Sequence, residues 1–246
     1  MNHPRVSREE WLKARIALLQ KEKAFTRLRD ELTRQIRELP WVRVEKPYYF
    51  DGPDGRESLG DLFGPNRQLL VYHFMLGPDW EQGCKSCSFW ADNYQGIPIH
   101  LAHRDVSFVT VSRAPFQKIE QFQQRMGWRF KWVSSFETDF NFDFCVSFTE
   151  NEIAAKTAFY NYTPTGEVAD EMPGVSVFYK DGSEIFHTYS TFARGLDLLN
   201  GAYNYLDLVP KGRDERAEST MEWLRHHDRY ETKTTTAPIS GESRHA

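Results

Sequence analysis

Cys84 and Cys87 are the residues in this sequence whose type and spacing are best suited to covalent chemistry. They precede a segment, residues 88–102, that can be helical with a break at Pro98. Backbone N–H groups and the dipole at a helix start lower the pKa of a thiol, and the thiolate is the nucleophile of disulfide exchange. We therefore expect Cys84 to attack a substrate and Cys87, one turn later, to attack the resulting mixed disulfide. Lys85 adds a positive charge that would help keep Cys84 ionised.

Zinc binding and inert burial are the alternatives to redox chemistry for the cysteine pair. Two thiols can bind zinc together with histidines, although a structural zinc site usually recruits a second close pair of ligands. The histidines that could assist are His73, His100, His103, His187, His226 and His227. The thiols could also be buried and inert. The pair follows a predicted buried strand and opens a predicted helix, which favours redox chemistry, and we predict no metal and no cofactor.

Further polar candidates lie in the second half of the chain. Alternation in residues 140–146 predicts a strand with Cys145 on one face, where it acts as a small hydrophobe or as a third redox thiol. Alternation also places His187 on the same face as Tyr189. His187 then either lines a pocket near the thiols or is a structural histidine with satisfied hydrogen bonds. His226-His227-Asp228 is expected to be solvated surface.

The elements that must position these residues alternate between strand and helix. Such alternation indicates an α/β domain with a parallel portion of sheet, and Asp181-Gly182 signals a late antiparallel hairpin. Residues 134–171 are expected to be an irregular insertion. The predicted strands are residues 41–50, 69–76, 106–112, 128–133, 175–179 and 185–190. The predicted helices include residues 114–126 and a last amphipathic helix over residues 196–206.

The sequence predicts one long helix over residues 7–39, ended by Pro40, with Ser7 and Glu10 forming a capping box. An apolar stripe runs through Phe25, Leu28, Leu32, Ile36 and Leu39. This helix lies across its own domain or forms the subunit contact of a homodimer. We divide the chain into a helical extension (residues 1–40), one domain (residues 41–230) and a disordered tail (residues 231–246).

Composition excludes several classes of protein. The net charge of −4 over 246 residues gives no nucleic-acid footprint. No apolar run approaches the ~20 residues that span a bilayer, and no secretory signal is visible at the start. Three cysteines cannot form a full disulfide framework, which fits a reducing compartment. From these observations together we expect a cytoplasmic protein that binds neither membranes nor nucleic acids.

Several sequence blocks together resemble one bacterial family. They are Gly83-Cys84-Lys85-Ser86-Cys87-Ser88-Phe89-Trp90-Ala91-Asp92-Asn93, Val111-Ser112-Arg113-Ala114-Pro115, Arg125-Met126-Gly127-Trp128, Val177-Phe178-Tyr179, His187-Thr188-Tyr189-Ser190, Ala193-Arg194-Gly195-Leu196-Asp197 and Tyr203-Asn204-Tyr205-Leu206-Asp207-Leu208. The sequence is similar over residues 7–230 to the thioredoxin-like family called domain of unknown function 899. The resemblance implies a mixed central sheet flanked by helices and supplies no reaction.

The wider thioredoxin superfamily adds expectations for the site. It implies that Cys84 attacks and Cys87 resolves, and that a cis Pro173 presents the Met172 main chain to the substrate. A trans Pro173 that simply introduces a strand is the alternative. Here Lys-Ser replaces the usual Gly-Pro between the cysteines, and the preceding loop is long, as in a peroxiredoxin.

These observations lead to one main hypothesis and two alternatives. The main hypothesis is a thiol–disulfide oxidoreductase or a thiol-dependent peroxide reductase, with a disulfide or peroxide substrate and a thiol reductant. The alternatives are a non-catalytic binding or assembly module with the same fold, and a Cys/His metal-binding protein.

Overall fold

The chain divides into two units in the computed structural model, Met1–Val42 and Arg43–Ala246. The structure describes residues 3–216, 218 and 220–231. Apart from Glu231, the predicted tail lies outside the described residues. Within the described part of the chain, no helix is both long enough and apolar enough to cross a membrane.

The first unit is built on one helix, α1 (Arg8–Arg37). The predicted capping box is confirmed, because Ser7 Oγ accepts from the Glu10 N–H at 3.2 Å and the Ser7 N–H donates to Glu10 Oε2 at 2.9 Å. The helix ends before Pro40, as predicted. No residue of α1 is buried.

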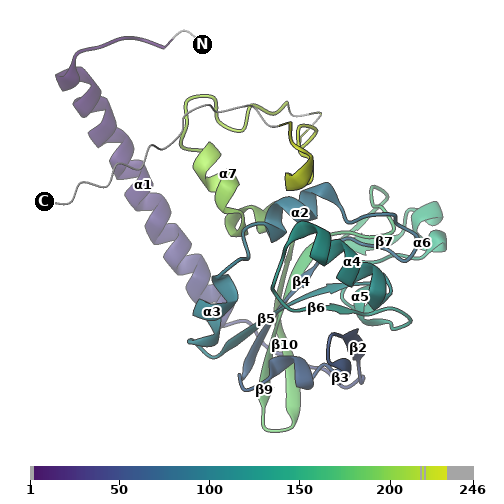
Figure 1. Cartoon of the computed structure of the whole chain (residues 1–246). Coiled ribbons are helices and arrows are strands. Elements are labelled where there is room, and N and C mark those ends of the chain that lie inside the picture. The colour runs from purple at the N-terminus through teal and green to yellow at the C-terminus, as the bar shows by residue number, and fades with distance from the viewer. Residues whose placement is uncertain (1–2, 217, 219, 232–246) are drawn as a thin grey trace, which may run out of the picture. The chain divides into compact units, whose positions relative to one another are not determined.

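The second unit is organised around a mixed sheet, which has eight strands among the described residues (Figure 1). The central pair β4 and β5 is parallel, β9 pairs antiparallel with the other side of β4, and β10 pairs antiparallel with β9. In sheet order the strands are β1 (Val42–Arg43), β10 (Glu184–Phe192), β9 (Gly174–Asp181), β4 (Gln68–His73), β5 (Val106–Ser112), β6 (Trp132–Ser134), β2 (Tyr49–Gly52) and β3 (Gly55–Ser58).

The connections of this sheet are thioredoxin-like. Strand β4 leads through the cysteine loop into α2 (Lys85–Ala91), the chain returns as the parallel strand β5, and the β9–β10 hairpin completes the other side. The predicted fold class is therefore confirmed. The other helices are η1 (Asp61–Phe63), α3 (Ile97–Ala102), α4 (Phe116–Met126), α5 (Phe140–Asp143), α6 (Glu150–Ala155), η2 (Ala193–Leu199), α7 (Gly201–Leu206) and η3 (His227–Arg229).

Two of the predicted helices differ from the prediction, one in the position of its break and one in being divided at all. The break between α2 and α3 covers residues 92–96, not Pro98, because Pro98 lies in the first turn of α3 where its missing N–H costs nothing. Gly96 has φ +86° and starts that second helix. The last helix is divided into η2 and α7.

The insertion over residues 134–171 is more ordered than predicted. It contains α5, α6 and a two-stranded hairpin, β7 (Ala158–Tyr160) with β8 (Thr163–Thr165). The strand predicted over residues 140–146 is wrong. The chain forms α5 there, and Cys145 has a left-handed backbone with φ +55°.

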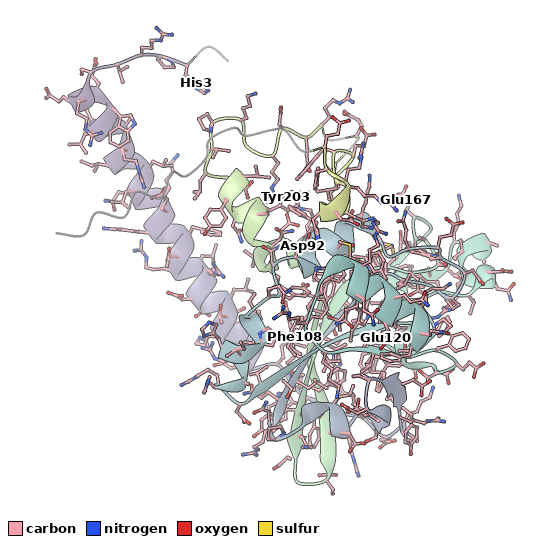
Figure 2. All side chains as sticks on the ribbon, viewed as in Figure 1. His3, Asp92, Phe108, Glu120, Glu167 and Tyr203 are labelled. Atoms are coloured by element: carbon pink, nitrogen blue, oxygen red, sulfur yellow. The ribbon has the colours of Figure 1, made fainter. Side chains whose placement is uncertain are left out.

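The sheet separates two hydrophobic cores. Alternation along β4 sends Tyr72 to the face that α2 and α4 cover, and sends Val71 to the opposite face with Phe140 of α5. The first core is rich in aromatic side chains, and α7 contributes Tyr203, whose ring centroid is 5.6 Å from that of Trp90 (labelled Tyr203 in Figure 2). Helix α2 therefore packs against both the sheet and α7.

Candidate active site

Cys84 lies at the start of α2 and is held there by its neighbours along the chain. It is the N-cap residue, and its N–H donates to the Met75 carbonyl at 3.0 Å. Gly83, directly before it, has no space for a side chain, because a Cβ there would lie 2.6 Å from Phe122 and 2.7 Å from Phe74. The glycine therefore allows the cysteine loop to pack directly on the aromatic core.

The two thiols of the pair differ in burial and in charge. Both are free, Cys84 is half-buried and Cys87 is buried. A hydrogen bond from the Cys87 thiol, helped by the N–H groups of Cys87 and Ser86, lowers the pKa of Cys84 to about 6. Burial and the hydrogen bond to Cys84 raise the pKa of Cys87 well above its usual value. These opposite shifts favour ionisation of Cys84 before Cys87.

Cys87 also accepts hydrogen bonds from β4 and from the residues directly after it. The Met75 N–H donates to its Sγ at 3.5 Å, and the Tyr72 hydroxyl is a further hydrogen-bond partner. Both interactions lower the pKa of Cys87, although burial outweighs them. These donors would stabilise a Cys87 thiolate once the negative charge on Cys84 is removed.

A cavity of about 220 Å³ opens beside Cys87, and its wall is almost entirely apolar. It lies between α2, the end of β4 and the η2 segment. Its lining residues are Tyr72, Met75, Ser86, Cys87, Trp90, Pro173, Ala193, Arg194, Leu196, Asp197 and Met221.

The structure brings Pro173 to the cysteine site. Pro173 lines the same cavity as Cys87, so the expectation of a shared site agrees with its position. The cis conformation is wrong, because the described residues contain no cis peptide bond. The Met172 N–H donates to the Val146 carbonyl at 2.8 Å and the Pro173 carbonyl accepts from the Tyr160 hydroxyl at 2.8 Å, so both groups already have partners.

The Lys85 side chain points away from the pair. Its Nζ donates to the Glu222 carbonyl at 3.5 Å. The groups that lower the pKa of Cys84 are the Cys87 thiol, the N–H groups of Cys87 and Ser86, and the Ser86 hydroxyl. Its expected effect on Cys84 stays a prediction.

His187 does not meet the cysteine pair but lines a second cavity, of about 120 Å³, together with Cys145. Its Nε2 contacts the Tyr189 carbonyl at 3.1 Å and Ser190 Oγ at 2.7 Å, and because a carbonyl can only accept, Nε2 carries the proton. A bulge between His187 and Tyr189 interrupts the alternation assumed from the sequence. Burial lowers the pKa of His187, so the imidazole is neutral and structural in its bonding.

Cys145 is an unpromising nucleophile. Burial and the carboxylates of Asp143 and Glu152 raise its pKa. Among the described residues, no three His, Cys, Asp or Glu side chains are grouped so that they could hold a metal ion.

His226 is a residue of the site that the sequence did not indicate. The expected solvated histidine is buried, and its Nε2 donates to the Gly83 carbonyl at 2.8 Å while Arg125 contacts its Nδ1 at 3.3 Å. Its neighbour His227 pairs with Asp92 at 2.7 Å. The C-terminal segment thus fastens the cysteine loop from a position 143 residues further along the chain. No local pattern around His226 could have indicated this contact.

A family model described as "Bacterial protein of unknown function (DUF899)" matches residues 1–230. The chain belongs to this family. The family expected from the sequence blocks is therefore confirmed. A comparison with curated proteins found no match.

Several solved structures are distantly similar to the chain. Peroxidoxin BcpB from Mycobacterium tuberculosis is 13% identical, with 65% of this chain and 94% of that chain covered and a TM-score of 0.44. A peroxiredoxin Q from Xanthomonas campestris is 14% identical, with 64% and 90% covered and a TM-score of 0.40. A putative thiol-disulfide oxidoreductase from Bacteroides vulgatus is 14% identical, with 37% and 60% covered and a TM-score of 0.28. Likenesses at this level say nothing about activity.

Proposed function

We propose that this protein is a thiol–disulfide oxidoreductase in which Cys84 is the nucleophile and Cys87 the resolving thiol. The observation that carries the proposal is the arrangement of the two thiols, because Cys84 is the half-buried N-cap residue of α2 and the buried Cys87 thiol donates a hydrogen bond to it. Cys84 is half-buried with a pKa of about 6, and Cys87 is buried and protonated. A thiolate next to a thiol is the starting arrangement for a two-step exchange.

In the first step the Cys84 thiolate attacks one sulfur of a substrate disulfide. The substrate S–S bond breaks, a mixed disulfide forms on Cys84, and the first substrate thiolate leaves and takes up a proton. In the second step Cys87 transfers its proton to the second leaving sulfur and attacks Cys84 Sγ. The substrate disulfide is reduced to two thiols and the protein pair is oxidised to a Cys84–Cys87 disulfide, which an external thiol reductant returns to the dithiol.

The donors around Cys87 suit the second step. While Cys84 is a thiolate, its hydrogen bond and negative charge raise the pKa of Cys87. Formation of the mixed disulfide removes that charge. The Met75 N–H and the Tyr72 hydroxyl then stabilise the Cys87 thiolate as it forms.

The apolar cavity beside Cys87 favours substrates with an apolar group next to the disulfide. The charged lining residues Arg194 and Asp197 already pair with each other at 2.9 Å, and the rest of the wall is mostly apolar, so a charged substrate would be desolvated there with little compensation. We expect an aromatic or aliphatic disulfide to react faster than glutathione disulfide.

Peroxide reduction by the same pair is the second candidate, favoured by the low pKa of the half-buried Cys84. The thiolate would attack a peroxide oxygen, releasing water or an alcohol and leaving a sulfenic acid that Cys87 condenses to the same disulfide with loss of water. We propose the cytoplasm for both reactions, because a thiol reductant that regenerates the dithiol is available in a reducing compartment.

Turnover and a redox titration test the proposal together. The wild-type protein, Cys84→Ser and Cys145→Ser are assayed with an apolar disulfide, then with hydrogen peroxide, using a thiol reductant as electron donor. Disulfide turnover that Cys84→Ser abolishes and Cys145→Ser leaves intact supports the proposal, and peroxide turnover alone supports the second candidate. A non-catalytic binding module is indicated if the pair forms no reversible disulfide and Cys84 titrates near ~8.5.

A further inference from the structure

Helix α1 presents a mostly apolar seam with a period of seven residues, interrupted by Lys21 and Gln35. The seam contains two alternating rows of positions, equivalent to a and d of a coiled coil. The first row is Trp11, Leu18, Phe25 and Leu32, and the second row is Ala14, Lys21, Leu28 and Gln35. The large side chains of the seam are among the most exposed apolar residues described, with Phe25 at 62%, Leu28 at 66% and Leu32 at 54% of full exposure.

A helix with such a seam is expected to have a partner. Most helical stability in proteins comes from packing an apolar face, and α1 buries no residue. A heptad seam over four repeats is the pattern that packs against another helix of the same pattern. A contiguous exposed apolar surface of this kind marks an interaction site.

We propose that two copies of this chain associate through α1 in an antiparallel coiled coil, with Phe25 of each copy facing Leu28 of the other. The pairing is independent of the redox cycle proposed above. It uses the same patch on both copies, as a two-fold dimer requires.

Lys21 decides the orientation. A parallel pair would place Lys21 opposite Lys21 of the second copy in the middle of the seam, which is a like-charge contact. The antiparallel pair places Lys21 opposite Leu32 of the second copy, where its methylene stem can pack while the ammonium reaches water. Gln35 likewise lies opposite Leu18 rather than a second Gln35.

The charges beside the seam decide the register. Arg15, Glu22 and Arg29 follow one another at seven-residue spacing along one flank, and Arg15 already contacts Glu22 of the same helix at 2.7 Å. With Phe25 facing Leu28, Glu22 faces Arg29 of the second copy. The two-fold symmetry of the dimer gives two such ion pairs, one on each side. A shift of one heptad in either direction would bring Arg29 against Arg29 or Glu22 against Glu22.

The first experiment measures the mass of the full chain in solution by sedimentation equilibrium over a range of micromolar concentrations. We expect a dimer for the wild-type protein and a monomer for Phe25→Glu combined with Leu28→Glu, with the alkylation rate of Cys84 unchanged. Leu12→Glu is the matched control. Leu12 is also apolar and exposed but lies off the seam, so this variant should stay dimeric. A wild-type monomer at all concentrations, or a dimer that survives the double substitution, overturns the proposal.

The second experiment tests orientation and register by charge reversal. Arg29→Glu replaces two attractive contacts by two repulsive ones and should raise the dimer dissociation constant about tenfold. Glu22→Arg combined with Arg29→Glu restores opposite charges and should return the constant close to the wild-type value. In a parallel pair Arg29 would face Ala24, so unchanged association of Arg29→Glu contradicts the antiparallel arrangement.

Discussion

Cys84 and Cys145 are both half-buried thiols, and their surroundings move their pKa values in opposite directions. Cys84 receives hydrogen bonds from the Cys87 thiol and from backbone N–H groups at the start of α2. Cys145 lies in a smaller cavity with carboxylates of Asp143 and Glu152 as neighbours. The difference shows that exposure alone does not make a cysteine reactive. Hydrogen-bond donors near a thiol lower its pKa and nearby negative charges raise it, and the balance between them decides which thiol ionises.

The largest contrast is expected in turnover with a disulfide substrate. Cys84→Ser removes the nucleophile and should lower the rate at least ~1,000-fold. Cys145→Ser should stay within about twofold of wild type, since a pKa raised by burial keeps that thiol protonated. Equal losses in the two variants would show that the two thiols work together and would end the contrast.

The pH dependence of alkylation measures the contrast directly. Only the thiolate reacts, so the rate at Cys84 should rise with pH to half its maximum near pH 6, whereas the rate at Cys145 should keep rising above pH 9. At pH 6 Cys84 should react about tenfold faster, even though a low-pKa thiolate is intrinsically less nucleophilic. Iodoacetamide labelling followed by peptide mass spectrometry resolves the three thiols.

Substitution of Cys87 separates its two roles. Cys87→Ala removes the hydrogen bond to the Cys84 thiolate, so the alkylation midpoint of Cys84 should move upward by about one pH unit. Cys87→Ser keeps a donor and should leave that midpoint near pH 6. Both variants should accumulate the mixed disulfide on Cys84, which intact-mass spectrometry detects. Rapid resolution in either variant would mean that another thiol resolves the intermediate.

Tyr72→Phe tests the hydrogen bond between the Tyr72 hydroxyl and Cys87. The variant keeps the aromatic ring in the core and removes one donor, so resolution of a preformed mixed disulfide should slow about five- to tenfold. The alkylation midpoint of Cys84 serves as the control and should hardly move. A normal rate of resolution in stopped-flow measurements would assign the stabilisation of Cys87 to the Met75 N–H alone.

The smallest expected effect is at the second cavity. Asp143→Asn removes a carboxylate that raises the pKa of Cys145, so its alkylation midpoint should fall by about half a pH unit. Burial is the larger cause and remains. A larger fall would show that charge, not burial, keeps Cys145 protonated.

The cysteine site and the sheet around it were accessible from the sequence because their signals are local. The apolar run that forms β4 is only about ten residues before Cys84 and Cys87, so one short stretch of sequence indicates both the strand and the cysteine site. Residues 140–146 misled because alternating phenylalanines fit a strand. Phe140 and Phe144 are also four residues apart, which places them on one face of a helical turn, and their ring centroids are 4.7 Å apart.

Contacts between distant segments could not be predicted in the same way. The bulge that redirects His187 depends on how β10 pairs with β9. The trans bond at Pro173 and the bond from His226 to Gly83 depend on the finished tertiary structure. Such contacts leave no periodic pattern in a single sequence.

The bond from His226 to the Gly83 carbonyl also has a consequence for biosynthesis. Strand β4, the cysteine loop and α2 leave the ribosome first, whereas the His226 side chain that fastens the loop is synthesised 143 residues after Gly83. During translation the Cys84 thiol therefore exists without its final restraint, exposed to any oxidant in the cell. The loop is therefore completed only after His226 has been synthesised, and a truncated polypeptide that stops before His226 carries the cysteine pair without this hydrogen bond.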